Sequence, residues 1–201
     1  MDHIDHVFYI NLKSRQDRKG LIEAQLEKYG LKAERFDAIY NPGSLAAGCM
    51  ESHLKVLKIA KERGYKNVLI LEDDFHFVVD ENQFVEQLDK FFTANIEYDV
   101  CFLSYHVIRA EKTQYDFIQR AVDCRTASGY LVNQHYYDKL IDLFATGLPK
   151  LITTRQHWIY ANDVIWQSLQ QTDNWYLFTP RIGVQRESYS DLARRVVNYN
   201  C

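Results

Sequence analysis

The sequence has 201 residues, of which 47% are hydrophobic, and its formal net charge is −3. This length and composition fit a folded α/β protein with a sizeable core and exclude a largely disordered chain. The near balance of 24 basic and 27 acidic residues gives no basis for expecting a nucleic-acid partner.

No apolar run approaches the roughly 20 residues of a membrane-spanning helix. Residues 1–6 also lack the basic and apolar regions of a signal peptide. The four cysteines form no CxxC pair, which favours reduced thiols. These features predict a cytoplasmic protein without a transmembrane segment. Arg194 and Arg195 would allow peripheral contact with an anionic glycolipid or membrane surface, although a solvated tail is the simpler interpretation.

The first half of the chain alternates predicted strands with predicted helices. Residues 7–12 form a predicted strand, and Ser14–Asp17 resembles a capping box that opens a helix ending at Gly30. A short strand at 33–36 and a helix at about 47–63 follow, with apolar residues at helical spacing.

A strand that ends in three carboxylates is the most informative stretch of the chain. Val68–Leu71 are apolar and precede Glu72, Asp73 and Asp74. Ligands of open α/β sheets bind beyond the carboxyl ends of the strands. Clustered carboxylates repel one another unless a cation neutralises them, and a hard divalent metal such as Mn²⁺ or Mg²⁺ suits oxygen ligands. The alternative is a solvated acidic turn.

The second half continues the alternation less regularly. We predict a helix at about 81–92, a strand at 98–104, a loop or irregular hairpin at 105–120, and a strand at 128–132. A helix capped by Asn133 should run to about Phe144 and end near Gly147–Pro149. Later elements are an extended aromatic segment at 156–160, a short helix capped by Asn162, and a strand at 175–178.

Alternating strands and helices favour a mostly parallel central sheet flanked by helices, with right-handed crossovers. The chain shows no internal repeat and no linker. We therefore expect one domain over residues 1–201 with a Rossmann-like α/β fold.

Three further groups of residues suit an anionic ligand or proton transfer. Arg15 lies with other basic residues beside a predicted helix start, where anions bind favourably. Ser52 and His53 lie near the start of the next helix and could donate hydrogen bonds to diphosphate or sugar hydroxyls. Asp163 could be a general base, although an aspartate in a first helical turn is also a common structural feature.

Taken together, these stretches resemble glycosyltransferase family 25, which includes lipooligosaccharide galactosyltransferases and procollagen galactosyltransferases. The resemblance is carried by four ordered stretches, with weaker similarity later in the chain. They are Tyr9–Arg18, Glu34–Ala38, Gly48–Leu54 and Tyr65–Phe75.

The resemblance implies a GT-A-like fold and a metal-dependent, inverting transfer of a hexose, galactose or glucose, from a UDP-sugar. Residues of about 1–104 would bind the nucleotide, and residues of about 105–201 would face the acceptor. Glu72 and Asp74 would hold Mn²⁺ or Mg²⁺, and Asp163 is our candidate catalytic base. The expected nucleotide-sugar contacts are Asn11, Arg15, Asp37, Ala38, Ser52, His53 and Asp73.

The acceptor implied by the resemblance is a hydroxyl on a glycan, a glycolipid or a collagen-like hydroxylysine. Two other classes of function remain open from the residues alone. Acidic strand ends also serve metal-dependent phosphohydrolases and nucleotidyltransferases. A non-catalytic module that binds nucleotide-sugars could keep the same fold.

Overall fold

A central sheet of eight strands organises the protein. The structure is a computed structural model that describes residues 3–190 and 195–197. The strand order is β2-β1-β3-β8-β5-β9-β7-β6. The bounds of these strands are β1 His6–Asn11, β2 Ala33–Asp37, β3 Asn67–Glu72, β5 Val100–Phe102, β6 His106–Lys112, β7 Ile118–Arg125, β8 Gly129–Asn133 and β9 Trp175–Phe178.

Most strands of the sheet point the same way. β1 pairs in parallel with both β2 and β3, and β5 pairs in parallel with β9. β8 runs antiparallel to its neighbours β3 and β5, and β7 runs antiparallel to β9 and β6. Strands β2, β1, β3, β5, β9 and β6 therefore share one direction, and β8 and β7 oppose it. The predicted mostly parallel sheet is confirmed.

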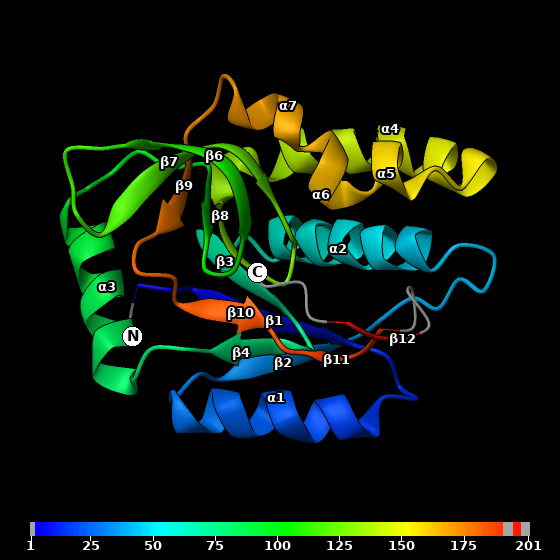
Figure 1. The fold of residues 1–201 in the computed structure, drawn as a ribbon, viewed down its shortest axis with the longest axis horizontal. Coiled ribbons are helices and arrows are strands. Elements are labelled where there is room, and N and C mark those ends of the chain that lie inside the picture. Colours follow the sequence, from blue (N-terminus) through cyan, green and yellow to red (C-terminus); the bar gives the residue numbers. More distant parts are fainter. Residues whose placement is uncertain (1–2, 191–194, 198–201) are drawn as a thin grey trace.

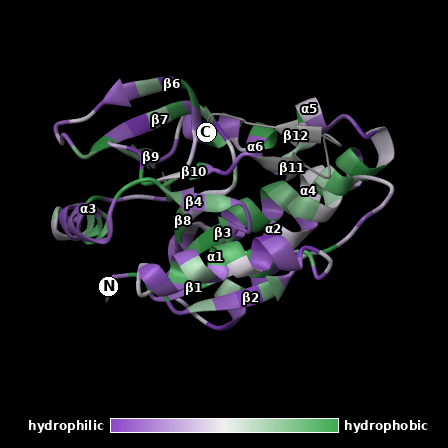
Figure 2. Cartoon of the chain, turned by 60° about the horizontal axis from the view of Figure 1, so that its bottom comes forward, coloured by the Kyte–Doolittle hydropathy of each residue, from purple (hydrophilic) through white to green (hydrophobic). Residues whose placement is uncertain are grey.

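Helices cover both faces of the sheet, as Figure 1 shows, with α1 on one side and α2 and α4 on the other. The helix bounds are α1 Gln16–Lys28, α2 Leu45–Glu62, α3 Glu81–Thr93, η1 Gln134–Tyr136, α4 Tyr137–Thr154, α5 His157–Tyr160, α6 Asn162–Ile165 and α7 Gln167–Gln170. The inner strand β3 is largely hydrophobic, whereas α1 and β6 carry many hydrophilic residues (Figure 2).

Alternation along β3 divides the core into two layers. Val68 and Ile70 belong to the apolar cluster shared with α2 and α4, and Leu69 and Leu71 belong to the cluster shared with α1 and α3. Successive side chains of a strand point to opposite faces, so this parity continues into the acidic residues that follow.

Two short ribbons lie beside the main sheet. β4 Phe75–Phe77 pairs antiparallel with β10 Gly183–Gln185, and β11 Ser188–Ser190 pairs with β12 Arg195–Val197. The first ribbon ties the chain after the acidic residues to a segment more than 100 positions later. It thereby fixes the turn at 73–74 between β3 and β4.

Three local predictions are wrong. α1 begins at Gln16 without a side-chain cap, because Asp17 accepts hydrogen bonds from the Arg15 guanidinium instead of forming a capping box with Ser14. Residues 157–160 form a helical turn rather than an extended segment, and Ala161 occupies the cap position predicted for Asn162.

The fourth predicted helix is also longer than expected. α4 passes through Pro149 and ends at Thr154. Proline removes one backbone donor, but Gly147 and Leu151 are both buried on the same face of the helix, so packing continues on either side of it. The irregular hairpin expected at 105–120 is present as β6 and β7, with register shifts between Val107 and Ala110.

Candidate functional site

A cleft of about 510 Å³ opens at the carboxyl ends of β1 and β3. The chain passes from β1 to β2 on one side and returns to β3 on the other, so this edge is a topological switch point where α/β sheets bind ligands. The cleft lining includes predicted site residues from widely separated segments. They are Arg15, Ala38, Ser52, Glu72, Asp73, Asp74 and Asp163.

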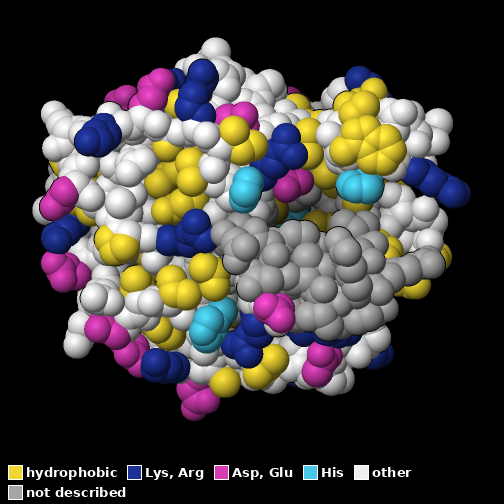
Figure 3. Space-filling view, viewed as in Figure 1, with side chains coloured by type: hydrophobic (Ala, Val, Ile, Leu, Met, Phe, Trp, Pro, Cys, Tyr) yellow, Lys and Arg dark blue, Asp and Glu magenta, His cyan; other side chains and the backbone are white. Residues whose placement is uncertain are grey.

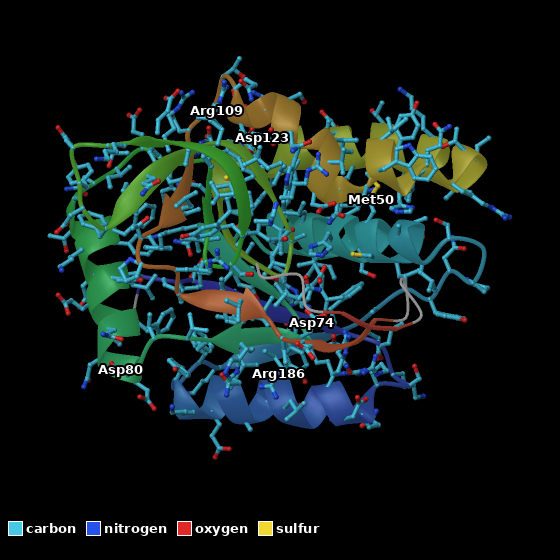
Figure 4. The ribbon with its side chains drawn as sticks, viewed as in Figure 1. Met50, Asp74, Asp80, Arg109, Asp123 and Arg186 are labelled. Carbon is cyan, nitrogen blue, oxygen red and sulfur yellow. The ribbon has the colours of Figure 1, made fainter. Side chains whose placement is uncertain are left out.

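The three acidic residues point in different directions because of the strand parity. Glu72 follows Ile70 onto the α2 side, and its carboxylate meets His53 and Cys49 of that helix. Asp73 follows Leu71 onto the α1 side, where it contacts Asn11 and Arg18. Asp74 lies in the turn after β3, and Figure 4 shows it in the interior between α1 and α2.

Arg18 neutralises part of the acidic cluster from the first turn of α1. Its guanidinium donates to Asp73 Oδ1 at 2.9 Å and to Asp74 Oδ2 at 3.0 Å. Asn11 Nδ2 donates to Asp73 Oδ2 at 2.7 Å, and Gln185 Nε2 donates to Asp74 Oδ2 at 3.1 Å. Burial nevertheless raises the pKa of Asp74 to about 7, with the nearby Glu72 charge adding to the effect.

A buried chain of hydrogen bonds orients Glu72. His53 Nε2 lies 3.0 Å from Glu72 Oε1, and His53 Nδ1 lies 2.8 Å from the hydroxyl of Tyr130. A carboxylate only accepts, so Nε2 of His53 donates to Glu72 Oε1. Cys49 Sγ also donates to Oε1, at 3.4 Å. Burial would raise the pKa of Glu72, but the hydrogen bond and charge of His53 outweigh it and lower that pKa.

One observation at Asp74 indicates that the acidic residues of the cleft fit a divalent cation. Asp74 Oδ1 is buried and has no hydrogen-bond partner among the described atoms. A buried carboxylate oxygen without a partner is costly, and a hard cation would satisfy it. Within the described residues, Cys49, His53 and Glu72 also offer ligand atoms that all lie within 4.8 Å of one another, but their contacts are already explained by hydrogen bonds to Glu72 Oε1.

Asp163 faces the same cleft from α6. Its Oδ2 accepts a hydrogen bond from the backbone N–H of Thr126 at 3.2 Å. Burial raises the pKa of Asp163, and the Glu72 charge contributes in the same direction. The structure thus brings together a carboxylate with a raised pKa and the acidic residues at 72–74.

Some of the predicted nucleotide contacts line the cleft, and others lie outside its lining. Arg15 and Ala38 line the cleft, and the backbone N–H of Ala38 donates to Asn11 O at 3.0 Å. Asn11 itself is buried behind Asp73. Asp37 lies at the exposed end of β2, outside the cleft lining, and pairs with Arg35. Its predicted contact with a nucleotide is therefore the least supported of the group.

Ser52 and His53 are fully buried, at 0% exposure each. The Ser52 hydroxyl donates to Gly48 O at 2.7 Å and accepts from Ile39 N–H at 2.8 Å, which fixes the loop before α2. His53 is engaged by Glu72 and Tyr130. Both side chains thus hold the cleft wall in place, and direct donation from either to a ligand has no support in their contacts.

Several residues of the site were not predicted. Arg18 was recognised only as one of several basic residues, and Cys49, Tyr130 and Gln185 had no assigned role. The parity of β8 could have indicated Tyr130, because the neighbouring Val132 shares its face with α2. The contact of Gln185 with Asp74 depends on the β4–β10 pairing, which has no local signal in the sequence.

Comparison with known proteins supports the resemblance seen in the sequence. No family model matches the chain. A protein named "Glycosyltransferase 25 family member", from Drosophila pseudoobscura pseudoobscura, is 26% identical over 191 residues, which cover 74% of this chain. The chain spans only 28% of that relative's length. The predicted resemblance to glycosyltransferase family 25 is confirmed by this match.

Two solved structures share the fold. A glycosyltransferase involved in the glycosylation of the major capsid of PBCV-1 has a TM-score of 0.51 and 10% identity, over 94% of this chain and 96% of that one. A mannose-1-phosphate geranyltransferase from Thermus thermophilus has a TM-score of 0.50 and 10% identity, over 92% and 74% of the chains. At this identity the likeness concerns the fold alone, and it confirms the predicted GT-A-like α/β class.

The predictions about membranes have a limited outcome. In the described part of the chain, no helix has both the length and the apolar character needed to cross a bilayer. Arg194 lies outside the described residues, and the side chain of Arg195 is not described. The predicted membrane contact of this pair therefore stays a prediction.

Proposed function

We propose that this protein is a metal-dependent, inverting glycosyltransferase that moves a hexose from a UDP-sugar to an acceptor hydroxyl. The observation that carries the proposal is the single cleft in which Glu72, Asp74 and Asp163 meet beside Arg15 and Arg18. The relative named as a family 25 glycosyltransferase supports the same activity.

The donor end of the cleft is assigned to the wall built from β1, β2 and the start of α1. Arg15 and Arg18, at the start of α1, bring positive charge to this wall of the cleft. Guanidinium groups pair favourably with the oxygens of a diphosphate. Ala38 and Ile39, at the end of β2, offer the small apolar surface on which a nucleobase can lie.

Glu72 and Asp74 are the proposed ligands of Mn²⁺ or Mg²⁺. When bound, the cation supplies positive charge that stabilises the leaving diphosphate. Asp74 offers its unpartnered Oδ1, and the chain from Tyr130 through His53 occupies Oε1 of Glu72. Glu72 is thereby left to act through Oε2. Arg18 holds Asp73 and Asp74 in place and reduces their mutual repulsion.

Asp163 is the proposed general base. It is held by the Thr126 N–H, and its raised pKa brings its basicity closer to that needed near neutral pH. A base that deprotonates the acceptor hydroxyl from the face opposite the leaving group gives inversion in one displacement. Galactose and glucose are the proposed donor sugars.

The test is a donor screen that measures UDP release. UDP-galactose and UDP-glucose are supplied with and without Mn²⁺, and methyl glycosides serve as acceptors. We expect release that requires the metal and increases with acceptor. Hydrolysis of simple phosphate esters without any UDP-sugar turnover would instead indicate a phosphohydrolase.

Asp163→Asn separates the role of the base from that of binding. We expect turnover to fall by about 10²–10⁴-fold, the usual contribution of a positioned base, with UDP binding retained. Asp142→Asn is a suitable control because Asp142 is an exposed residue of α4 that lies outside the cleft lining. Near-normal turnover in Asp163→Asn would remove Asp163 as the base.

A further inference from the structure

We propose that the indole of Trp158 is the platform of an acceptor subsite that takes a pyranose ring of a glycan. This inference rests on the glycosyltransferase function proposed above and names its acceptor class. Its starting point is the unequal exposure of the three tryptophans: Trp166 and Trp175 are 0% exposed, and Trp158 is 61% exposed. A large apolar ring that is left open to solvent at the edge of a cleft commonly marks a binding surface.

The position of Trp158 ties it to the proposed base. Trp158 lies on α5 and lines the cleft together with His157, Ala161 and Asp163. Only Ala161 separates α5 from α6, and its N–H donates to His157 O at 2.9 Å while its carbonyl accepts from Ile165 N–H at 2.9 Å. Trp158 and Asp163 therefore belong to one continuous wall of the cleft.

A neighbouring ring restrains the indole. The His157 imidazole packs edge-on against it, with 5.2 Å between ring centroids and an interplanar angle of 80°. Hydrophobic side chains gather over α5 in the space-filling view (Figure 3), and α5 carries two large exposed apolar residues, Trp158 and Ile159. Of these two, Trp158 is the one that lines the cleft.

A further exposed aromatic ring of the cleft, that of Tyr40, lies on the proposed donor side. Tyr40 is 65% exposed and follows β2, beside Ala38 and Ile39. Aromatic side chains of the cleft lining are Tyr40, His157 and Trp158. Of these, Trp158 offers the largest apolar face on the wall that carries Asp163, so an acceptor approaching the base meets it.

The chemistry of the wall favours a sugar. The C–H face of a pyranose is apolar and carries partial positive charge, which suits the negative face of an indole. Arg125 lines the same cleft, so a sugar that carries an anionic group would find a cation near the indole.

Intrinsic fluorescence tests binding without relying on turnover. With Mn²⁺ and UDP present, methyl β-galactoside, methyl β-glucoside, lactose and a hydroxylysine-containing collagen peptide are titrated into the protein. We expect one or more of the glycans to change tryptophan emission, because the other two indoles are buried. Trp158→Phe should abolish the change. A response to the peptide alone, or to none of the compounds, would overturn the proposal.

Kinetics provides the matched comparison. Trp158→Ala should raise the KM for the glycan acceptor about tenfold or more, with the donor KM changed less than about twofold. Trp158→Tyr should recover most of the acceptor affinity. Ile159→Ala is the control, since Ile159 is 44% exposed and lies outside the cleft lining. Equal acceptor KM values in Trp158→Ala and Ile159→Ala would refute the subsite.

If the wild-type protein released no UDP from any donor but glycans still changed Trp158 emission, the proposed function would fail and the sugar subsite would stand.

Discussion

The environment of Asp74 disfavours its ionised carboxylate when no cation is bound. Burial raises its pKa from 3.8 to about 7, and its Oδ1 has no hydrogen-bond partner among the described atoms. Arg18 and Gln185 both bind Oδ2, so neither relieves the other oxygen. A site that holds a carboxylate in this state is set up to exchange a proton for a metal ion.

Asp74→Asn should therefore stabilise the metal-free protein at neutral pH. A carboxyl group with a raised pKa in the folded state does not lower the free energy of unfolding at a pH below its pKa in the unfolded chain. It destabilises progressively as pH rises from about 4 to about 7. The full shift corresponds to at most about 4 kcal/mol, so the variant should gain up to that amount at pH 7.5 and almost nothing at pH 4.

Thermal unfolding in a metal chelator across this pH range checks the prediction. Mn²⁺ should raise the melting temperature of the wild type, more at pH 7.5 than at pH 5.5, and should leave Asp74→Asn nearly unchanged. Asp142→Asn, an exposed change on α4, controls for the loss of one negative charge. A wild-type protein that is as stable as Asp74→Asn at every pH would contradict the assigned environment of Asp74.

Tyr130 acts on the site through His53 rather than by touching a ligand. Its hydroxyl and the imidazole form the buried support of Glu72 Oε1. Tyr130→Phe leaves His53 Nδ1 without its partner, and we expect Mn²⁺ affinity to fall about 10–100-fold, as for other groups that orient a metal ligand. Calorimetric titration of Mn²⁺ measures this directly.

Tyr137→Phe is a matched control for that change. Tyr137 is 1% exposed, and its hydroxyl donates to the carbonyl of Tyr65 at 3.1 Å, outside the cleft. Both variants should lose about 1–3 kcal/mol of stability from an unsatisfied buried partner, and only Tyr130→Phe should lose Mn²⁺ affinity. Equal Mn²⁺ affinity in the two variants would show that Glu72 does not depend on this support.

At the scale of elements, close packing on Phe75 holds the acidic turn. Phe75 follows Asp74 directly, and its ring fills the space left by glycines of β8 and β10. A Cβ at Gly183 would lie 2.1 Å from Phe75 Cζ, and one at Gly129 would lie 2.5 Å from Phe75 Cε2. Neither glycine has a positive φ, so an effect of substitution there reports packing rather than backbone strain.

Gly183→Ala should therefore destabilise the protein by about 1–3 kcal/mol in urea unfolding, because the aromatic ring must move. Phe75→Leu in the same chain should recover part of that loss. Gly20→Ala is the control: nothing lies within 4 Å of the added Cβ on α1, and the better helix propensity should add about 0.5–1 kcal/mol. A stable Gly183→Ala variant would contradict the packing of Phe75.

Local signals explain which elements were predictable. β1, β2, β3 and α2 follow from apolar periodicity, and Gly30 and Gly64 end their helices with φ of 62° and 69°. The length of α4 was not predictable, because Pro149 is a local stop signal that burial of Leu151 overrides. The antiparallel direction of β8 likewise depends on its pairing with β3 and β5, which are distant in sequence.

The site likewise has features with a local signal in the sequence and features that depend on distant contacts. The order of carboxylates at 72–74 and the basic residues before α1 are visible in the sequence, and strand parity could have separated Glu72 from Asp73. Asp163 was nominated as the base because it follows the aromatic segment at 156–160, and no spacing in the sequence predicts that it meets residues 72–74. That meeting depends on α6 packing across the carboxyl edge of the sheet, which no local pattern encodes.

At the scale of the whole molecule, the two halves of the chain share one sheet. β8 lies between β3 and β5, and β9 pairs with β5, so strands of residues 105–201 complete the sheet begun by residues 1–104. The cleft is divided in the same way, with Asp74 and Asp163 on opposite sides of that boundary in sequence. Neither half has a complete core or a complete site without the other.

We therefore expect one cooperative unfolding transition for the whole chain. In scanning calorimetry the measured enthalpy of unfolding should equal the van't Hoff enthalpy. UDP with Mn²⁺ should raise the temperature of the single transition, because a ligand at 100 times its Kd adds about 2.7 kcal/mol to the free energy of unfolding. A fragment of residues 1–104 should show no cooperative melting, because β3 and β5 would lose the strand that joins them. Two resolved transitions, or a fragment that melts cooperatively, would mean that the nucleotide-binding half folds independently and that the cleft forms between separate units.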